Sequence, residues 1–287
     1  MAKVSYGNRR AGILVHLRQP QRLRLIAEGL PVIAASARSF WDSSRQLENG
    51  SREATVLEGF AEEEAAKALI LMDMARCPAK QVARRAGTIV RTFYGHLGRL
   101  IYADAQHWRP VNIDQLREYV DHARQGHTLE GFAGEYIVPN WQRYSREAAM
   151  YADVEVYEDG VPQWSAPTGS LSKTIFGGPP NALALVDAMA TTGMFTHKGV
   201  RIINEVWGAL DFVDVQQFDD GRRLTGEMFD RLDAARLITD AATDEHYRVL
   251  YNNWQMPMYA LEFSEIAVPL EELEARREAA LWSEIGY

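Results

Sequence analysis

Apolar residues recur every three to four positions along most of the chain, which is the spacing of one face of an α-helix. In the first part of the chain this period predicts helices over residues 21–48, 52–76 and 79–106. Later stretches with the same period are 112–124, 142–150, 181–193, 197–210, 222–239 and 269–284. We expect Pro31 to break the first helix or to lie in its first turn, and Ser51 to cap the second helix.

Residues 151–164 depart from the helical period. Valines alternate with polar residues there, and Asp159-Gly160 is a turn signal, so the segment predicts a short β-hairpin. The stretch 177–180 reads Gly-Gly-Pro-Pro, which is typical of a linker. The pattern therefore predicts an all-α protein, with a helical domain at 20–170 that contains the hairpin and a helical C-terminal extension at 180–287.

The composition is that of an ordinary globular protein, with 47% apolar and 24% charged residues in 287. No apolar run is long enough to span a bilayer, and residues 1–7 lack the apolar core of a secretory signal. The single cysteine, Cys77, excludes an intrachain disulfide and a multi-cysteine zinc site. We therefore expect a cytoplasmic protein without a membrane partner.

A basic window lies within this acidic chain, whose formal net charge is -8. Residues 74–103 contain no acidic residue, and their basic residues are Arg76, Lys80, Arg84, Arg85, Arg91 and Arg99. A basic island on an acidic protein suggests a small anion site rather than a surface that coats nucleic acid. Within the window, Arg91 could bind a phosphate and His96 could move a proton near neutral pH. Such a pair could cut RNA by internal transesterification without a metal ion.

The helical geometry sets a condition on this pair. On a continuous helix Arg91 and His96 would lie about 140° apart around the axis. Their convergence therefore requires a long arginine reaching round the helix, a distortion near Gly95, or a partner subunit that completes the site.

Three consecutive glutamates precede Lys67 and could supply a carboxylate to the same site. Glu64 interrupts the apolar stripe of its predicted helix, and a carboxylate on a buried face is costly unless it is paired or functional. Glu64 is therefore the favoured site residue, whereas Glu62 and Glu63 are interpreted as charges on a solvated helix face.

Other chemistries lack their motifs in this sequence. There is no phosphate-binding Gly-x-x-x-x-Gly-Lys-Ser/Thr loop, no Gly-x-Gly-x-x-Gly, no Gly-x-Ser-x-Gly and no His-Glu-x-x-His. No histidine has a glutamate three residues before it, as a di-iron helical bundle would require. We expect neither a metal ion nor a cofactor.

Four segments resemble one protein family, in the order in which that family carries them. Ala61-Glu-Glu-Glu-Ala-Ala-Lys67 resembles the Ala-x-Glu-Glu-x-x-Lys signature of AbiV-type abortive-infection proteins. Phe93-Tyr-Gly-His-Leu-Gly-Arg99 is similar to the family's Phe-x-x-His-x-x-Lys segment, with arginine in place of lysine. Arg146-Glu-Ala-Ala-Met-Tyr-Ala-Asp153 and Trp164-Ser-Ala-Pro167 resemble its Arg-x-x-x-x-Tyr-x-Asp and Trp-x-x-Pro segments.

The resemblance implies a fold and an activity. The family is grouped with the HEPN superfamily, whose helical domains often carry Arg-x(4–6)-His, a spacing that Arg91 and His96 match. Members with this motif are typically metal-independent endoribonucleases that act as dimers. The resemblance thus implies a HEPN-like helical bundle and an RNA-cleaving effector of phage defence. The catalytic residues would be Arg91, His96 and Glu64, and the substrate-binding residues Lys67, Arg84 and Arg99.

The expected partners follow from this function. They are RNA, a second copy of the chain in a homodimer, and a phage-derived trigger protein. In the dimer, Arg91 of one subunit could approach His96 of the other. Two alternatives stay open: a non-catalytic helical sensor that recognises a phage component, and a regulator that binds a nucleotide at the basic window.

Overall fold

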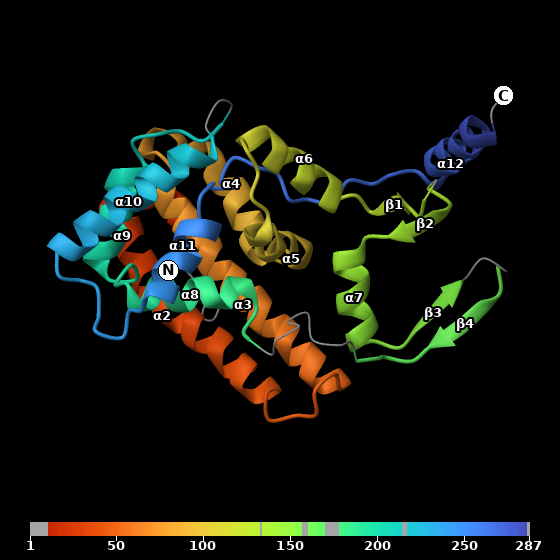
Figure 1. The fold of residues 1–287 in the computed structure, drawn as a ribbon, viewed down its shortest axis with the longest axis horizontal. Coiled ribbons are helices and arrows are strands. Elements are labelled where there is room, and N and C mark those ends of the chain that lie inside the picture. The colour runs from red at the N-terminus through yellow and green to blue at the C-terminus, as the bar shows by residue number, and fades with distance from the viewer. Residues whose placement is uncertain (1–10, 133, 157–159, 170–177, 214–216, 286–287) are drawn as a thin grey trace, which may run out of the picture.

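The computed structural model describes residues 11–132, 134–156, 160–169, 178–213 and 217–285. The chain is mostly helical, with 64% helix and 8% strand. Within the described ranges it forms 12 α-helices and two small antiparallel sheets of two strands each. The prediction of an all-α fold with a small β-hairpin insertion is confirmed (Figure 1).

The helices are α1 (Ile13–His16), α2 (Gln19–Ser44), α3 (Arg52–Arg76), α4 (Ala79–Tyr94), α5 (His96–Asp104), α6 (Ile113–Ala123), α7 (Trp141–Met150), α8 (Asn181–Thr191), α9 (His197–Trp207), α10 (Phe218–Ala234), α11 (Asp244–Asn253) and α12 (Leu270–Ile285). A 3-10 turn, η1 (Ala105–His107), follows α5. The strands are β1 (His127–Glu130), β2 (Tyr136–Pro139), β3 (Asp153–Val156) and β4 (Pro162–Ser165), and they pair as β1–β2 and β3–β4.

Helix α3 is the central helix of the molecule. It packs against α2, α4, α5, α7, α8 and α9. As predicted, Ser51 caps its start, because the Ser51 hydroxyl accepts a hydrogen bond from the backbone N–H of Ala54. From Ala65 to Arg76 every residue except Lys67 is buried. A helix enclosed on all sides has no solvated face, so its polar side chains need partners inside the protein.

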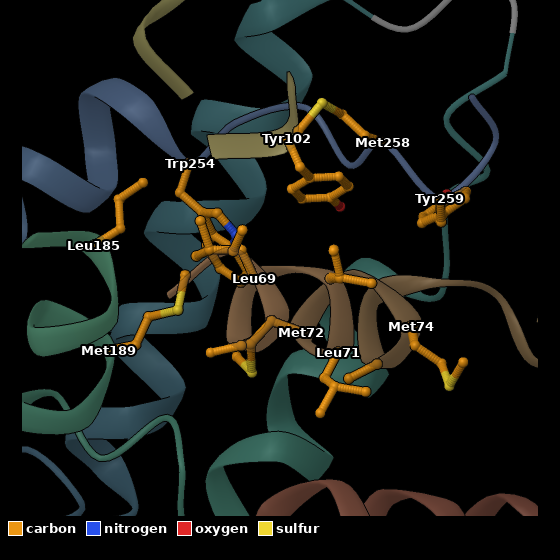
Figure 2. Close-up of a cluster of buried hydrophobic side chains, with 14 of the residues drawn as sticks. Leu69, Leu71, Met72, Met74, Tyr102, Leu185, Met189, Trp254, Met258 and Tyr259 are labelled. Carbon is orange, nitrogen blue, oxygen red and sulfur yellow. The ribbon is translucent and has the colours of Figure 1, made fainter. Parts of the chain in front are cut away.

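One hydrophobic core extends from Leu14 to Phe263. Figure 2 shows its central part, where Leu69 and Met72 of α3 lie in one cluster with Trp254 and with Met189 of α8. Helices α8 and α9 pack on α2 and α3, so the predicted segments 20–170 and 180–287 contribute to the same core. The linker predicted between them lies partly outside the described residues, which resume at residue 178.

The two hairpins, α7 and α12 lie together at one side of the helical body (Figure 1). The hairpin predicted over residues 151–164 is confirmed as β3–β4, in which Asp153 lies opposite Ser165. The predicted turn residue Asp159 lies outside the described residues. Hairpin β1–β2 and helix α11 are not predicted by the period. Strand β2 reads Tyr-Ile-Val-Pro, in which apolar and polar residues do not alternate.

Two predicted helix boundaries are wrong. Pro31 neither breaks α2 nor lies in its first turn, because the extensive packing of α2 along α3 offsets the backbone hydrogen bond that proline cannot donate. The helix predicted over 79–106 is divided at Gly95, which adopts an extended conformation with φ −76° and ψ 128°. This break positions the site described next.

Candidate functional site

The site is built around the buried carboxylate of Glu63, on α3. Its side chain is 3% exposed and has three partners from two other helices. From α5, His96 Nδ1 lies 2.8 Å and Arg99 Nη2 3.2 Å from Oε2. From α7, Arg146 Nε donates to Oε1 at 2.7 Å. We call these four residues the Glu63 cluster.

The break at Gly95 is what brings two α5 side chains to α3. His96 is the first residue of α5 and Arg99 lies three residues later, so both side chains extend from the same face. The turn is tight: a Cβ at Gly95 would lie 3.3 Å from the carbonyl oxygen of Arg91. A Cβ at Gly98 would lie 3.2 Å from the Thr92 side chain, so glycine permits the close approach of α5 to α4.

The two contacts of His96 Nδ1 favour one tautomer of the imidazole ring. Nδ1 lies 2.8 Å from the Glu63 carboxylate, which only accepts, and 3.0 Å from Arg99 Nη2, which only donates. If Nδ1 carried no hydrogen, its lone pair would face a carboxylate oxygen at 2.8 Å. The same Nδ1 cannot both donate to Glu63 and accept from Arg99. The shorter distance and the charge of the carboxylate favour donation to Glu63, which leaves Nε2 as the acceptor nitrogen of the neutral ring. Within the described part of the chain, nothing hydrogen-bonds to Nε2.

His96 opens to solvent although its carboxylate partner is buried. Its side chain is 57% exposed and lines a groove of about 190 Å³. Arg91, 60% exposed, lines the same groove, so one chain brings both predicted catalytic residues to one cleft. Burial of Arg99 lowers its pKa, although the charges of Glu63 and Glu64 act in the opposite direction.

Arg91 is held by a carboxylate on the far wall of the groove. Its Nη2 donates to Glu262 Oε2 at 3.1 Å and to Thr88 Oγ1 at 2.9 Å. The other Glu262 oxygen accepts from the backbone N–H of Phe263 and from the N–H and hydroxyl of Ser264. Burial alone would raise the pKa of Glu262, but the hydrogen bonds from Ser264 and Arg91 outweigh burial and lower it.

The other predicted site residues lie around this cluster in different ways. Glu64 forms an ion pair with Lys67, whose ammonium lies 5.8 Å from the centre of the Phe93 ring. Arg84 is exposed on α4 and is not part of the cluster. Its neighbour Arg85 is buried and binds Asp211 through two hydrogen bonds of 2.5 and 3.0 Å.

The interpretation of Glu62 and Glu63 as solvated charges is wrong. The two residues are 7% and 2% exposed, because α5 and α7 pack against α3 in addition to the helices that cover its apolar residues. The apolar period alone could not identify Glu63. Arg146 also lacked a signal of its own, and only the resemblance of residues 146–153 marked its segment.

A larger cavity, of about 290 Å³, lies on another side of the Glu63 cluster. Both Glu63 and Arg146 line it, together with apolar side chains that include Trp41, Phe60 and Leu100. Its described lining contains four carboxylates, from Glu58, Glu62, Glu63 and Asp104. Two openings thus border one buried carboxylate.

Neither the family models, the curated proteins nor the solved structures with which the chain was compared contain a match. Among the described residues, no three His, Cys, Asp or Glu side chains are grouped so that they could hold a metal ion. The same residues contain no helix with the length and hydropathy needed to cross a membrane.

Proposed function

We propose that this chain is a metal-independent endoribonuclease whose base is His96. The observation that carries the proposal is the hydrogen bond from an exposed imidazole to a buried carboxylate, beside an arginine in the same groove. A carboxylate that orients a histidine and stabilises its protonated form is a recurrent arrangement in general acid–base catalysis.

The proposed reaction uses two groups of the chain, Arg91 and His96. Arg91 binds the phosphate and balances charge that develops on its oxygens. His96 Nε2 takes the proton from a ribose 2′-hydroxyl as the 2′-oxygen forms a bond to phosphorus. The bond from phosphorus to the 5′-oxygen breaks, and the protonated imidazole returns the proton to that leaving oxygen. The products are a 2′,3′-cyclic phosphate and a 5′-hydroxyl.

Glu63 has a positioning role in this proposal. It keeps the hydrogen on Nδ1, so that Nε2 faces the substrate as a base, and it stabilises the imidazolium that forms during the reaction. Arg99 and Arg146 hold the two oxygens of Glu63 and fix the direction of the carboxylate. Glu64 and Lys67 contribute charge near the cluster without contacting the imidazole.

We further propose that this cleavage serves phage defence. The chain would act as a homodimer, and a phage-derived trigger protein would activate it. The support is the resemblance of four ordered segments to AbiV-type proteins, because three of these segments contain members of the Glu63 cluster. Because Arg91 and His96 line one groove within a single chain, pairing across subunits is not needed to bring them together.

The experiment is cleavage of total cellular RNA by the purified full chain in EDTA, comparing wild type with His96→Ala. General acid–base catalysis is worth about 10²- to 10⁴-fold, so the variant should lose cleavage to that extent. Because His96 is exposed, the variant should fold normally, which circular dichroism checks. Equal cleavage by both proteins would contradict the proposal.

A second candidate function, a small-molecule sensor, is favoured by the 290 Å³ cavity beside Glu63. Its carboxylates disfavour a phosphorylated ligand, and Trp41 and Phe60 offer aromatic surface to an uncharged or cationic one. This candidate predicts that guanosine or spermidine raises the Tm and that GMP does not. A sensor without catalysis would also retain its protective effect in cells after His96→Ala.

A further inference from the structure

The side of the molecule that carries the hairpins exposes many large apolar side chains. We define the arm as the described residues of 127–165, which comprise β1, β2, α7, β3 and β4. Phe132 is 91% exposed, Trp164 80% and Trp141 69%, with Tyr136 and Tyr151 also more than half exposed. Strands β3 and β4 make no extensive contact with any other described helix or strand. An isolated two-stranded hairpin is at best marginally stable in water, and exposed aromatic clusters mark interaction surfaces.

The exposed charges of the arm are mainly acidic. Glu130, Glu135 and Asp153 are exposed, and none of them forms an ion pair with the part of the chain that the structure describes. The basic residues of the arm are already engaged: Arg143 pairs with Glu147 and Glu265, and Arg146 belongs to the Glu63 cluster. A partner for this surface therefore needs positive charge and must accept aromatic rings.

One face of α4 has these properties. Lys80, Ala83, Arg84 and Gly87 are exposed at helical spacing along it. Neither Lys80 nor Arg84 forms an ion pair within the described ranges of the chain. Among the described residues, a Cβ at Gly87 would meet only Arg91 Nη1, at 3.9 Å, so no described side chain covers this position. Arginine on a flat surface favours stacking with aromatic side chains and pairing with carboxylates.

We propose that two copies of the chain associate by reciprocal docking of the arm of each copy on the Lys80–Gly87 face of α4 in the other. A two-fold axis makes both contacts equivalent, so the assembly closes as a dimer and leaves no arm uncovered. Acidic groups meet basic groups in each contact, and the exposed aromatic side chains leave water. Since Gly87 lies one helical turn before Arg91, a docked arm borders the groove that contains His96.

The test uses the full chain and two sets of charge reversals on exposed residues. The helix variant is Lys80→Glu with Arg84→Glu, and the arm variant combines Glu130→Lys, Glu135→Lys and Asp153→Lys. Sedimentation equilibrium should give a dimer for wild type and a monomer for each variant alone. A mixture of the two variants should restore a dimer, because each reversed surface then meets its complement.

A matched control reverses two exposed basic residues outside α4, Arg24→Glu with Lys198→Glu, and should leave the dimer intact. Circular dichroism establishes that each variant is folded. A monomeric wild type at all concentrations would overturn the proposal and point to a different basic protein as the partner of the arm. A dimer that survives both reversals, or a mixture that stays monomeric, would also overturn it.

Discussion

Helix α3 carries two carboxylate clusters, around Glu63 and around Asp73, ten residues apart. They differ in whether a partner of the carboxylate reaches solvent. Around Asp73 every group is buried. Asp73 binds Arg76 Nε at 2.7 Å, the backbone N–H of Met258 at 2.6 Å and the hydroxyl of Tyr102. The guanidinium of Arg76 lies over two tryptophan rings, 3.9 Å from the centre of Trp254 and 4.6 Å from that of Trp207.

The Glu63 cluster uses the same chemistry but ends at the surface. Both clusters give a buried carboxylate three partners, at least one of which is a guanidinium. In the Asp73 cluster the third donor is Tyr102, whose pKa is raised by burial and by Asp73, so it stays neutral. In the Glu63 cluster it is His96, whose imidazole can accept or donate a proton and is exposed. A carboxylate–arginine pair on a central helix thus offers chemistry only where a titratable partner reaches solvent.

The largest effect on stability is expected at the buried cluster. Asp73→Ala leaves the Arg76 charge buried without its carboxylate, so the free energy of unfolding should fall by about 3–5 kcal/mol. Chemical denaturation measures this change. The control is Asp114→Ala, which removes an exposed pair with Arg117 and should cost less than about 1 kcal/mol. Similar losses for the two variants would remove the distinction between buried and exposed pairs.

A smaller loss of stability, combined with a loss of activity, is expected for Glu63→Gln. The amide offers one acceptor oxygen where the carboxylate serves three donors, so unfolding should become easier by about 1–3 kcal/mol. Because the imidazole loses its orienting charge, RNA cleavage should fall by about 10²- to 10⁴-fold. Cleavage by the folded variant at the wild-type rate would refute the positioning role of Glu63.

The smallest effect concerns Glu262, which would compete with phosphate for Arg91 in the proposed reaction. The Arg91–Glu262 pair is more than a third exposed on both sides, and such pairs are worth about 0.2–1 kcal/mol. Glu262→Gln should therefore raise kcat/KM for RNA by about 1.4- to 5-fold. The control is Glu265→Gln. Glu265 lines the same groove but pairs with Arg143 rather than Arg91, so this variant measures the effect of removing one negative charge from the groove. Equal increases for the two variants would contradict a specific role of Arg91.

Much of the fold could be predicted from the chain because local signals agree with the tertiary structure. The capping hydroxyl of Ser51 and the apolar period gave α3 its observed limits, Arg52–Arg76. The alternation in residues 151–164 gave hairpin β3–β4. The prediction for Pro31 is wrong because the packing of α2 on α3 outweighs the tendency of proline to break a helix. The apolar period does not show how strongly two helices pack.

The site could be predicted only in part, for a physical reason. Residue chemistry and spacing selected His96, which belongs to the cluster, and Arg91, which lines its groove. The family resemblance added Arg99, as a substrate-binding residue. The choice between Glu63 and Glu64 depends on which helices surround α3, and this is a property of the whole fold. The turn at Gly95 brings His96 towards Glu63. A glycine within a helical period does not by itself predict that the helix ends there.

The comparison of the two clusters is tested most directly by measuring stability and RNA cleavage together for His96→Ala and Tyr102→Phe. The account predicts that His96→Ala loses cleavage in EDTA and keeps the wild-type free energy of unfolding to within about 1 kcal/mol. Tyr102→Phe should lose about 1–3 kcal/mol of stability and cleave normally while folded. Cleavage by His96→Ala at the wild-type rate would contradict the account.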